Sequence, residues 1–408
     1  MKELVNRYLD KRSLHQSFNV LGVLPQKKDS GCVAVVIPVK DEYPDLFLTL
    51  QSLAKSLALC EKKTTSKDFY VVCVVNGKSD DSEQTKENNK KCLELLLGND
   101  PGYILPELCI TVLDCATKGC EIPCEHGVGF ARKLGMDFAL SCGATTIACL
   151  DSDTLVSENY CQQLFDFDLR HDFPYSSPKS MAAAVTDFSH QKGATPAQDR
   201  AVKIYQNYMK EHSRHLKECG TIFYPVALGP TLVCTASAYV ACGGMNLHTA
   251  GEDFYFLQSL IKTLGKPLPM LESMVFPSAR ESCRVPFGTG RAVKEICDYE
   301  EQPSNGETEI QFNPPLAVTG YPVFVYDQIK CLIRLVEESC EDPLDSVALE
   351  KRLSASIPKT TDFLRLENFF SVWEKLRKNN TSPQNLKRAF QCWLDGLKII
   401  RLVHFLLR

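Results

Sequence analysis

The chain has 408 residues, of which 44% are hydrophobic and 24% charged, and its formal net charge is -4. This is an ordinary globular composition without the basic excess of nucleic-acid-binding proteins, so we expect no nucleic-acid partner. No apolar run reaches the roughly 18 residues that a transmembrane segment needs, and residues 1–20 lack the apolar core of a signal peptide. The odd number of cysteines, 19, argues against a complete disulfide framework. We therefore expect a cytoplasmic protein.

Short apolar stretches alternate with helical patterns in residues 31–154. The predicted strands are residues 33–38, 69–75, 109–113 and 146–150. The predicted helices are residues 46–59, 81–97 and 128–140. This alternation predicts an α/β fold with a mostly parallel sheet flanked by helices, in which the carboxyl ends of the strands share one ligand-binding edge.

The rest of the chain divides into a less regular part and a helical part. Strand patterns occur at residues 181–185 and 231–235, and helix patterns occur at residues 197–217 and 252–264. The pattern from residue 321 onward is almost entirely helical. The expected organisation is a helical lead-in over residues 1–30, one α/β domain over residues 31–320 and a helical C-terminal region over residues 321–408.

The C-terminal region ends in an amphipathic stretch. Ser382-Pro383 supplies an N-cap and a first-turn proline for a helix. The apolar face of this helix would consist of Leu386, Phe390, Trp393, Leu394, Leu397 and Ile400. Such a face predicts either a helix packed on the catalytic domain or a peripheral contact with a membrane or a partner.

Two aspartates directly follow the last of the four predicted strands. Asp151 and Asp153 stand at positions i and i+2, so both carboxylates of an extended chain point to the same side. Their oxygens suit a hard divalent cation, manganese or magnesium, which could bridge the two phosphates of a nucleotide. An acidic pair at this place could equally be a turn or a helix cap.

A second acidic pair, Glu252-Asp253, opens the predicted helix 252–264. One interpretation is a general base that takes the proton from an attacking hydroxyl group. The other is a favourable interaction of acidic residues with the helix dipole. His248, shortly before this pair, is either a third metal ligand or an ordinary loop residue.

Polar residues also follow the first two predicted strands. Asp41-Glu42, Asn76 and Asp80 could read a nucleobase and its ribose, although Asn76-Gly77 could be only a tight turn. The glycine-rich stretch 127–135 lacks the full spacing of a dinucleotide-binding loop and does not follow a strand. Arg132 within this stretch could contact a diphosphate or a carboxylate.

Three arginines, Arg280, Arg284 and Arg291, lie in a stretch that also contains Gly288 and Gly290. Guanidinium groups and backbone amides freed by glycine suit an anionic group, such as a phosphate or a carboxylate of an acceptor. The alternative is an ordinary loop with surface arginines.

Taken in chain order, these motifs resemble those of the family 2 glycosyltransferases, which have the GT-A fold. The matching elements are Pro38-Val39-Lys40-Asp41-Glu42, Asn76-Gly77-Lys78-Ser79-Asp80, residues 127–135, Asp151-Ser152-Asp153, and Gly243-Gly244 with Glu252-Asp253. The chain departs from the family pattern at Val75 and Asn76, which replace acids, and at Lys133, which replaces an asparagine.

The resemblance implies metal-dependent transfer of a sugar, of the hexosyltransferase class, from a nucleotide donor of UDP or GDP type to an acceptor hydroxyl. It implies a nucleotide-binding half over residues 31–154 and an acceptor-binding half over residues 155–320. The residues that it implies in donor binding are Pro38, Asp41, Glu42, Asn76, Asp80, Arg132, Asp151 and Ser152. It implies that Asp253, with Glu252 beside it, is the base of a direct displacement with inversion, while Asp151 and Asp153 hold the metal.

Two alternatives to this function stay open. One is a retaining GT-A enzyme that makes a sugar-glycerate type of product. The other is a non-catalytic protein that binds a nucleotide sugar. The sequence does not determine the sugar, the nucleobase, the acceptor or the oligomeric state.

Overall fold

The computed structural model describes residues 2–14, 16–25, 31–60, 68–105, 107–171, 181–281, 288–300 and 314–408. The chain forms two compact units. The first comprises Met1–Ala194, Ala227–Leu264 and Leu268–Arg280. The second comprises Thr195–Val226, Gly265–Pro267 and Glu281–Arg408.

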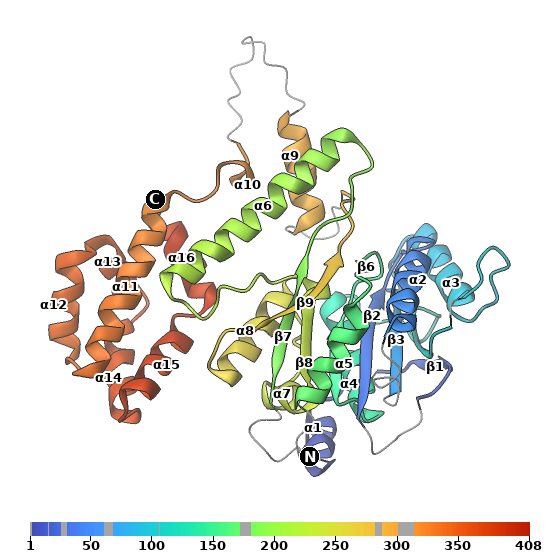
Figure 1. The fold of residues 1–408 in the computed structure, drawn as a ribbon, viewed down its shortest axis with the longest axis horizontal. Helices are drawn as coiled ribbons and strands as arrows, with labels where there is room; N and C mark the ends of the chain where they lie inside the picture. Colours follow the sequence, from blue (N-terminus) through green and yellow to red (C-terminus); the bar gives the residue numbers. More distant parts are fainter. Residues whose placement is uncertain are drawn as a thin grey trace, which may run out of the picture. The chain divides into compact units, whose positions relative to one another are not determined.

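The first unit is built on a sheet whose strands, in the described part of the chain, follow the order β1-β4-β3-β2-β5-β8-β7-β9-β6 (Figure 1). The strands are β1 Asn19–Gly22, β2 Cys32–Val39, β3 Asp68–Asn76, β4 Ile110–Cys115, β5 Thr146–Cys149, β6 Leu155–Val156, β7 Ala183–Phe188, β8 Leu232–Thr235 and β9 Met270–Phe276. The neighbours β4, β3, β2 and β5 run parallel, as do β7 and β9. The remaining pairs are antiparallel. The predicted α/β fold with a parallel central sheet is confirmed, and antiparallel strands extend it on both sides.

The parallel part of the sheet is the core of this unit. Every residue of β2 and of β4 is buried, as expected for apolar strands that are covered on both faces. Val39 of β2 is in register with Val75 of β3, and Val36 is in register with Cys149 of β5. This register brings the residues that follow β2, β3 and β5 to the same edge of the sheet.

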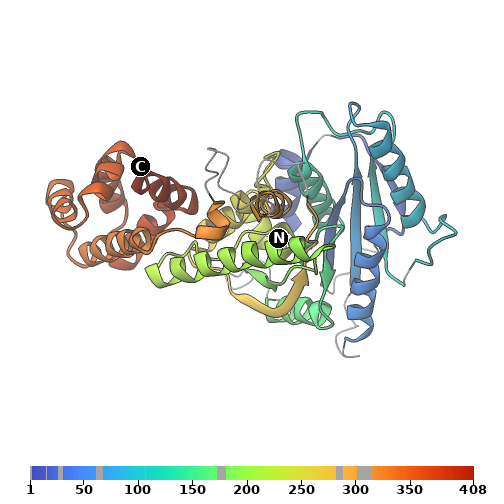
Figure 2. The ribbon, with the colours of Figure 1, turned by 90° about the horizontal axis from the view of Figure 1, so that it is seen from above.

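Helices cover both faces of the sheet (Figures 1 and 2). The helices of this unit are α1 Lys2–Arg12, α2 Asp45–Ala58, α3 Glu83–Leu96, α4 Val128–Ser141, α5 Tyr160–His171, α7 Ala236–Ala241 and α8 Glu252–Leu264. Helix α4 packs so closely that a Cβ on Gly135 would lie 2.5 Å from Val36 Cγ1 and 2.8 Å from Val74 Cγ2. On the opposite face, Phe165 of α5 packs on Phe69 of β3 with 6.0 Å between ring centroids. Neighbouring strand residues point to opposite faces, so α4 and α5 enclose the sheet.

The structure contains strands that the sequence patterns did not predict. Strand β1 is short and mostly exposed, and β6 has only two residues, so neither carries a hydrophobic period. Strand β9 contains Glu272 and Ser273, which interrupt its apolar pattern. Strand β1 pairs with β4, so residues 1–30 contribute a sheet edge as well as the predicted helix.

Helix α1 is attached to the rest of this unit by a buried polar network. Tyr8 Oη donates to Asp137 Oδ1 at 3.0 Å and accepts from Lys133 Nζ at 2.9 Å. Tyr239 Oη donates to the same Asp137 oxygen at 2.7 Å, and Lys133 forms an ion pair with Asp137. Gly244 has a φ of 79°, and any side chain at this position would collide with the Tyr8 hydroxyl. These contacts fix α1 against α4 and α7.

The second unit is helical. Its helices are α6 Pro196–Cys219, α9 Thr289–Glu300, α10 Leu316–Thr319, α11 Val323–Glu341, α12 Ser346–Ser356, α13 Pro358–Leu366, α14 Phe369–Asn379, α15 Pro383–Trp393 and α16 Gly396–Leu406. Helix α6 is capped by the Thr195 hydroxyl at its start and by left-handed Gly220 at its end. Because α6 packs on α9, α10 and α11, it groups with the helical unit, whereas the sequence predicted a single α/β domain over residues 31–320.

The C-terminal amphipathic stretch forms two helices instead of the predicted one. Ser382 caps α15 as expected, and the side chain of Asp395 caps a new helix, α16. Asp395-Gly396 favours a cap and a turn over helix continuation, which explains the break. After the break Ile399 is buried, whereas Leu397 is 38% exposed. No helix in the described ranges has the length and apolar character needed to cross a bilayer.

Candidate functional site

Acidic side chains gather at the carboxyl edge of the parallel strands. Asp41 and Glu42 follow β2, Asp80 follows β3, and Asp151 and Asp153 follow β5. The side chain of Glu42 is 4% exposed, that of Asp153 is 20% exposed and that of Asp151 is 31% exposed. Asp151 and Asp153 are therefore more accessible to a ligand than Glu42 is, and Asp80 is exposed as well.

The Asp151-Ser152-Asp153 turn is held by neighbouring side chains. Thr49 Oγ1 on α2 donates to the carbonyl oxygen of Ser152 at 2.9 Å. Gln191 Nε2 donates to the carbonyl oxygen of Asp153 at 2.7 Å. Ser152 is itself buried, so its side chain lies inside the turn while both aspartate side chains stay partly open to solvent.

Arg132 joins two acidic elements that lie far apart in the sequence. Its Nη2 donates to Asp151 Oδ1, and its Nε donates to Glu252 Oε1 at 3.0 Å. The Arg132 side chain is 3% exposed and that of Glu252 is 6% exposed. The ion pairs connect α4, the loop after β5 and the first turn of α8.

The glycines at the start of α4 permit this arrangement. A Cβ on Gly127 would lie 2.7 Å from the carbonyl oxygen of Thr249, and one on Gly129 would lie 2.5 Å from that of His248. Residues 127–135 thus form a packing element on which the chain before α8 rests.

Arg280 carries the second cluster of ion pairs. It follows β9 and pairs with Glu42, with Asp153 Oδ2 at 3.0 Å and with Asp45 Oδ2 at 3.8 Å. Predicted site residue Arg284 lies outside the described residues. Arg291 belongs to α9 of the second unit and pairs with Glu295 at 2.6 Å.

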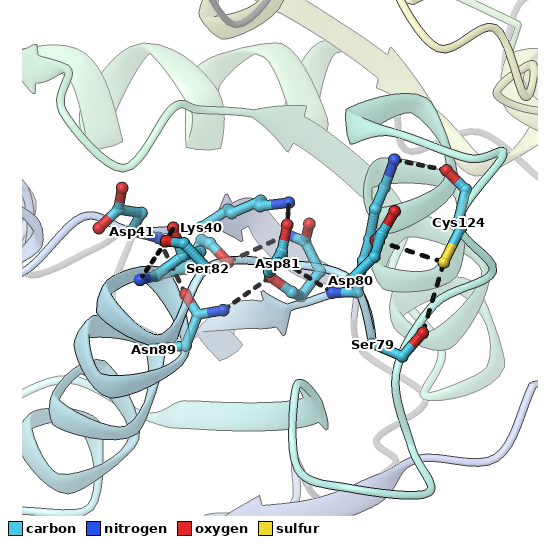
Figure 3. A network of polar contacts seen from close by, with 12 residues as sticks. Lys40, Asp41, Ser79, Asp80, Asp81, Ser82, Asn89 and Cys124 are labelled. Atoms are coloured by element: carbon cyan, nitrogen blue, oxygen red, sulfur yellow. Dashed lines mark hydrogen bonds and ion pairs between the residues drawn. The ribbon is translucent and has the colours of Figure 1, made fainter.

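The backbone after β2 adopts an unusual conformation. Asp41 has a φ of 59°, in the left-handed region. Its N–H donates to Asn89 Oδ1 at 2.9 Å, and Asn89 Nδ2 donates to the carbonyl oxygen of Asn76 at 3.1 Å (Figure 3). Asn89 lies on the buried face of α3 and so braces the ends of β2 and β3 together. Its only sequence signal is an asparagine at a core position of an amphipathic helix.

Two predicted donor-binding residues of these strands are buried and contact other parts of the sheet. Pro38 is a buried member of β2 and is in register with Val74. Asn76 is also buried, and its Nδ2 donates to the carbonyl oxygen of Val39 at 3.0 Å.

A polar network continues along this edge, as Figure 3 shows. Lys40 Nζ pairs with Asp81 Oδ1 at 2.6 Å, and Asp81 Oδ2 accepts from the Lys78 N–H at 2.7 Å. The Cys124 thiol donates to Asp80 Oδ1 at 3.3 Å. Lys40 and Asp81 had no place in the sequence-based site, because their pairing depends on the approach of two separate strand ends.

The acidic pair at the start of α8 is partly buried. Asp253 Oδ1 accepts from the Phe254 N–H at 2.7 Å, and Asn246 Nδ2 donates to the carbonyl oxygen of Glu252 at 2.8 Å. His248 is exposed and stacks on Tyr255 with 4.1 Å between ring centroids. Within the described ranges, no three histidine, cysteine or acidic side chains are arranged to hold a metal ion.

Negative charge exceeds positive charge in this site. Its carboxylates are Glu42, Asp45, Asp151, Asp153, Glu252 and Asp253, and its guanidinium groups are Arg132 and Arg280. Burial raises the pKa of Asp153 to about 7, although Arg280 acts in the opposite direction. Burial also raises the pKa of Glu252 and of Asp253. Carboxylate oxygens are the ligands that hard divalent cations prefer, but Asp151 and Asp153 are each paired with an arginine here, and a cation on them stays a prediction.

No protein-family model matches this chain, and no curated protein matches it. Among solved structures, S. aureus TarS 1-349 is similar with 12% identity over 86% of this chain and 92% of that chain, with a TM-score of 0.38. Its complex with UDP-GlcNAc is similar with 12% identity over 86% of this chain and 92% of that chain, and the TM-score is 0.42. Its complex with UDP is similar with 13% identity over 87% of this chain and 89% of that chain, and the TM-score is 0.38. Similarity at this level does not establish an activity for this chain.

Proposed function

We propose that this protein is a glycosyltransferase that moves a sugar from a nucleoside diphosphate donor to an acceptor hydroxyl. The observation that carries the proposal is the Arg132 bridge between Asp151 and Glu252. It joins the Asp-Ser-Asp turn, which suits a diphosphate, to the Glu252-Asp253 turn, which suits a proton acceptor. A direct displacement needs both groups next to one sugar carbon.

The donor nucleoside is assigned to the edge formed by the ends of β2 and β3. Asp41 and Asp80 offer carboxylate oxygens there that can accept hydrogen bonds from base N–H groups and ribose hydroxyls. UDP and GDP sugars are the donors to test first, because the family resemblance implies a donor of this type.

The diphosphate is assigned to the Asp151-Ser152-Asp153 turn. A manganese or magnesium ion held by Asp151 and Asp153 would neutralise the charge that develops on the departing diphosphate. Arg280 is within reach of the same carboxylate of Asp153, so it adds positive charge at this end of the site.

Asp253 is assigned as the base. Its carboxylate would take the proton of the acceptor hydroxyl as the hydroxyl oxygen bonds to the anomeric carbon and the bond from that carbon to the diphosphate oxygen breaks. The raised pKa of Asp253, caused by burial, brings it closer to the neutral range in which a general base works well. Attack from the face opposite to the leaving group gives a product of inverted configuration.

A thermal-shift screen tests this proposal. The protein is heated with UDP, GDP, CDP and dTDP sugars, each with manganese and with a chelator. A ligand at about a hundred times its dissociation constant should stabilise the protein by about 2.7 kcal/mol. A shift for one nucleotide that is lost in chelator and in Asp153→Ala supports the assignment. If no nucleotide shifts the transition, the proposed function is wrong.

A further inference from the structure

The guanidinium of Arg132 is enclosed by the protein. Its Nε and Nη2 are used by Glu252 and Asp151, and its side chain is 3% exposed. Nη1 is also buried, and it has no hydrogen-bond partner within the described ranges. The Arg132 guanidinium thus binds two carboxylates in the interior of the protein. An arginine that binds a diphosphate would instead have its guanidinium exposed to solvent.

Gly229 closes one further side of this group. Gly229 is buried in the short helix Gly229–Thr231. A Cβ at this position would collide with Arg132 Nη2 and would lie 3.3 Å from Asp151 Oδ2. Only glycine therefore leaves room for the guanidinium between Asp151 and the backbone of residue 229.

We propose that Arg132 is a positioning residue that holds Asp151 and Glu252 at a fixed separation and so aims the first turn of α8 at the donor. In this role Arg132 contacts carboxylates and not the diphosphate, which is the second of the two contacts that the sequence suggested. The inference rests on the proposed function, because it concerns the alignment of the donor turn with the base Asp253.

The geometry of the bridge requires arginine. A guanidinium presents several N–H donors in a fixed plane and can hold two carboxylates at once, whereas a lysine ammonium is a single point charge on a flexible stem. Loss of the bridge lets the Asp151 turn and α8 move relative to each other. A misplacement of about 1 Å between reacting groups reduces turnover by about 100-fold.

Two variants disturb the bridge in different ways. Arg132→Lys keeps the charge and loses the second carboxylate contact, while Gly229→Ala keeps Arg132 and displaces its guanidinium. Lys133→Met is the matched control, because it removes a neighbouring buried cation of α4 that pairs with Asp137 and touches neither Asp151 nor Glu252. Circular dichroism and the melting temperature establish that each variant is folded.

Three measurements are made on the full chain. The dissociation constant of UDP and of GDP is measured with manganese by calorimetry. The rate of nucleoside diphosphate release from UDP-glucose and GDP-mannose, with water as the acceptor, gives turnover for whichever nucleotide binds. Hydrogen exchange of the peptides that cover residues 246–254 reports the order of the chain around the base.

The inference predicts a split between affinity and turnover. In Arg132→Lys and Gly229→Ala, turnover should fall by about 100-fold, nucleotide affinity should be kept and exchange over residues 246–254 should rise. Lys133→Met should lower the melting temperature without this fall in turnover. A loss of nucleotide affinity of about tenfold or more in Arg132→Lys would show that Arg132 contacts the diphosphate through Nη1, and would overturn the inference alone. Absence of nucleotide binding by the unmodified protein would overturn the proposed function together with it.

Discussion

Replacement of Asn89 by alanine removes the brace between the ends of β2 and β3. The Asn89 side chain accepts from the Asp41 N–H at 2.9 Å and donates to the carbonyl oxygen of Asn76 at 3.1 Å. A lost hydrogen bond costs about 1 kcal/mol, and a buried backbone N–H left without a partner costs about 1–3 kcal/mol. Asp41 is only half-buried, so water recovers part of the second cost. We expect Asn89→Ala to lower the free energy of unfolding by about 2–3 kcal/mol.

Ser82→Ala is the matched control for this change. Ser82 caps the same helix, α3, through the Thr85 N–H. Loss of such a cap costs about 1 kcal/mol.

The assay is urea unfolding followed by far-ultraviolet circular dichroism, with equal slopes in all variants. Both tryptophans, Trp373 and Trp393, belong to the second unit, so tryptophan fluorescence would report on the wrong part of the chain. If Asn89→Ala destabilised the protein no more than Ser82→Ala does, the role of Asn89 as a brace would be refuted.

Three further predictions concern packing, charge and catalysis. Gly135→Ala should destabilise the protein by about 1–3 kcal/mol in urea unfolding, because the new Cβ would lie 2.5 Å from Val36 Cγ1; a neutral result would mean that α4 can move off the sheet. Because the pKa of Asp153 is raised to about 7 in the folded protein, the folded protein holds a proton between about pH 4 and pH 7 that the unfolded chain has already released. The free energy of unfolding without metal should therefore fall as the pH rises to about 7. Asp153→Asn should flatten this part of the stability curve, and an unchanged curve would contradict the assigned pKa. Asp253→Asn should keep the nucleotide-induced thermal shift and lose sugar transfer; near-normal turnover would show that Asp253 is not the base.

Local sequence patterns were sufficient to predict the central strands and helices of this protein. The apolar run of β2, fully buried in the structure, needs no distant partner to be recognised as a strand. The acidic start and the apolar spacing of α8 predicted a helix over residues 252–264, which is where it lies. The same patterns placed Asp151 and Asp153 at the carboxyl edge of the sheet, because parallel strands with helical crossovers leave their carboxyl ends on one side.

Only the tertiary structure determined which groups meet at that edge. The partners of Arg132, Asp151 and Glu252, are 19 and 120 residues away in the sequence, and nothing in the local pattern of residues 127–135 indicates them. The same holds for Asn89, whose partners are the ends of two strands, and for the break at Asp395, which leaves Leu397 exposed. Secondary structure follows from backbone preference and from hydrophobic spacing over a few residues, whereas ion pairs and buried hydrogen bonds depend on how closely separate elements pack.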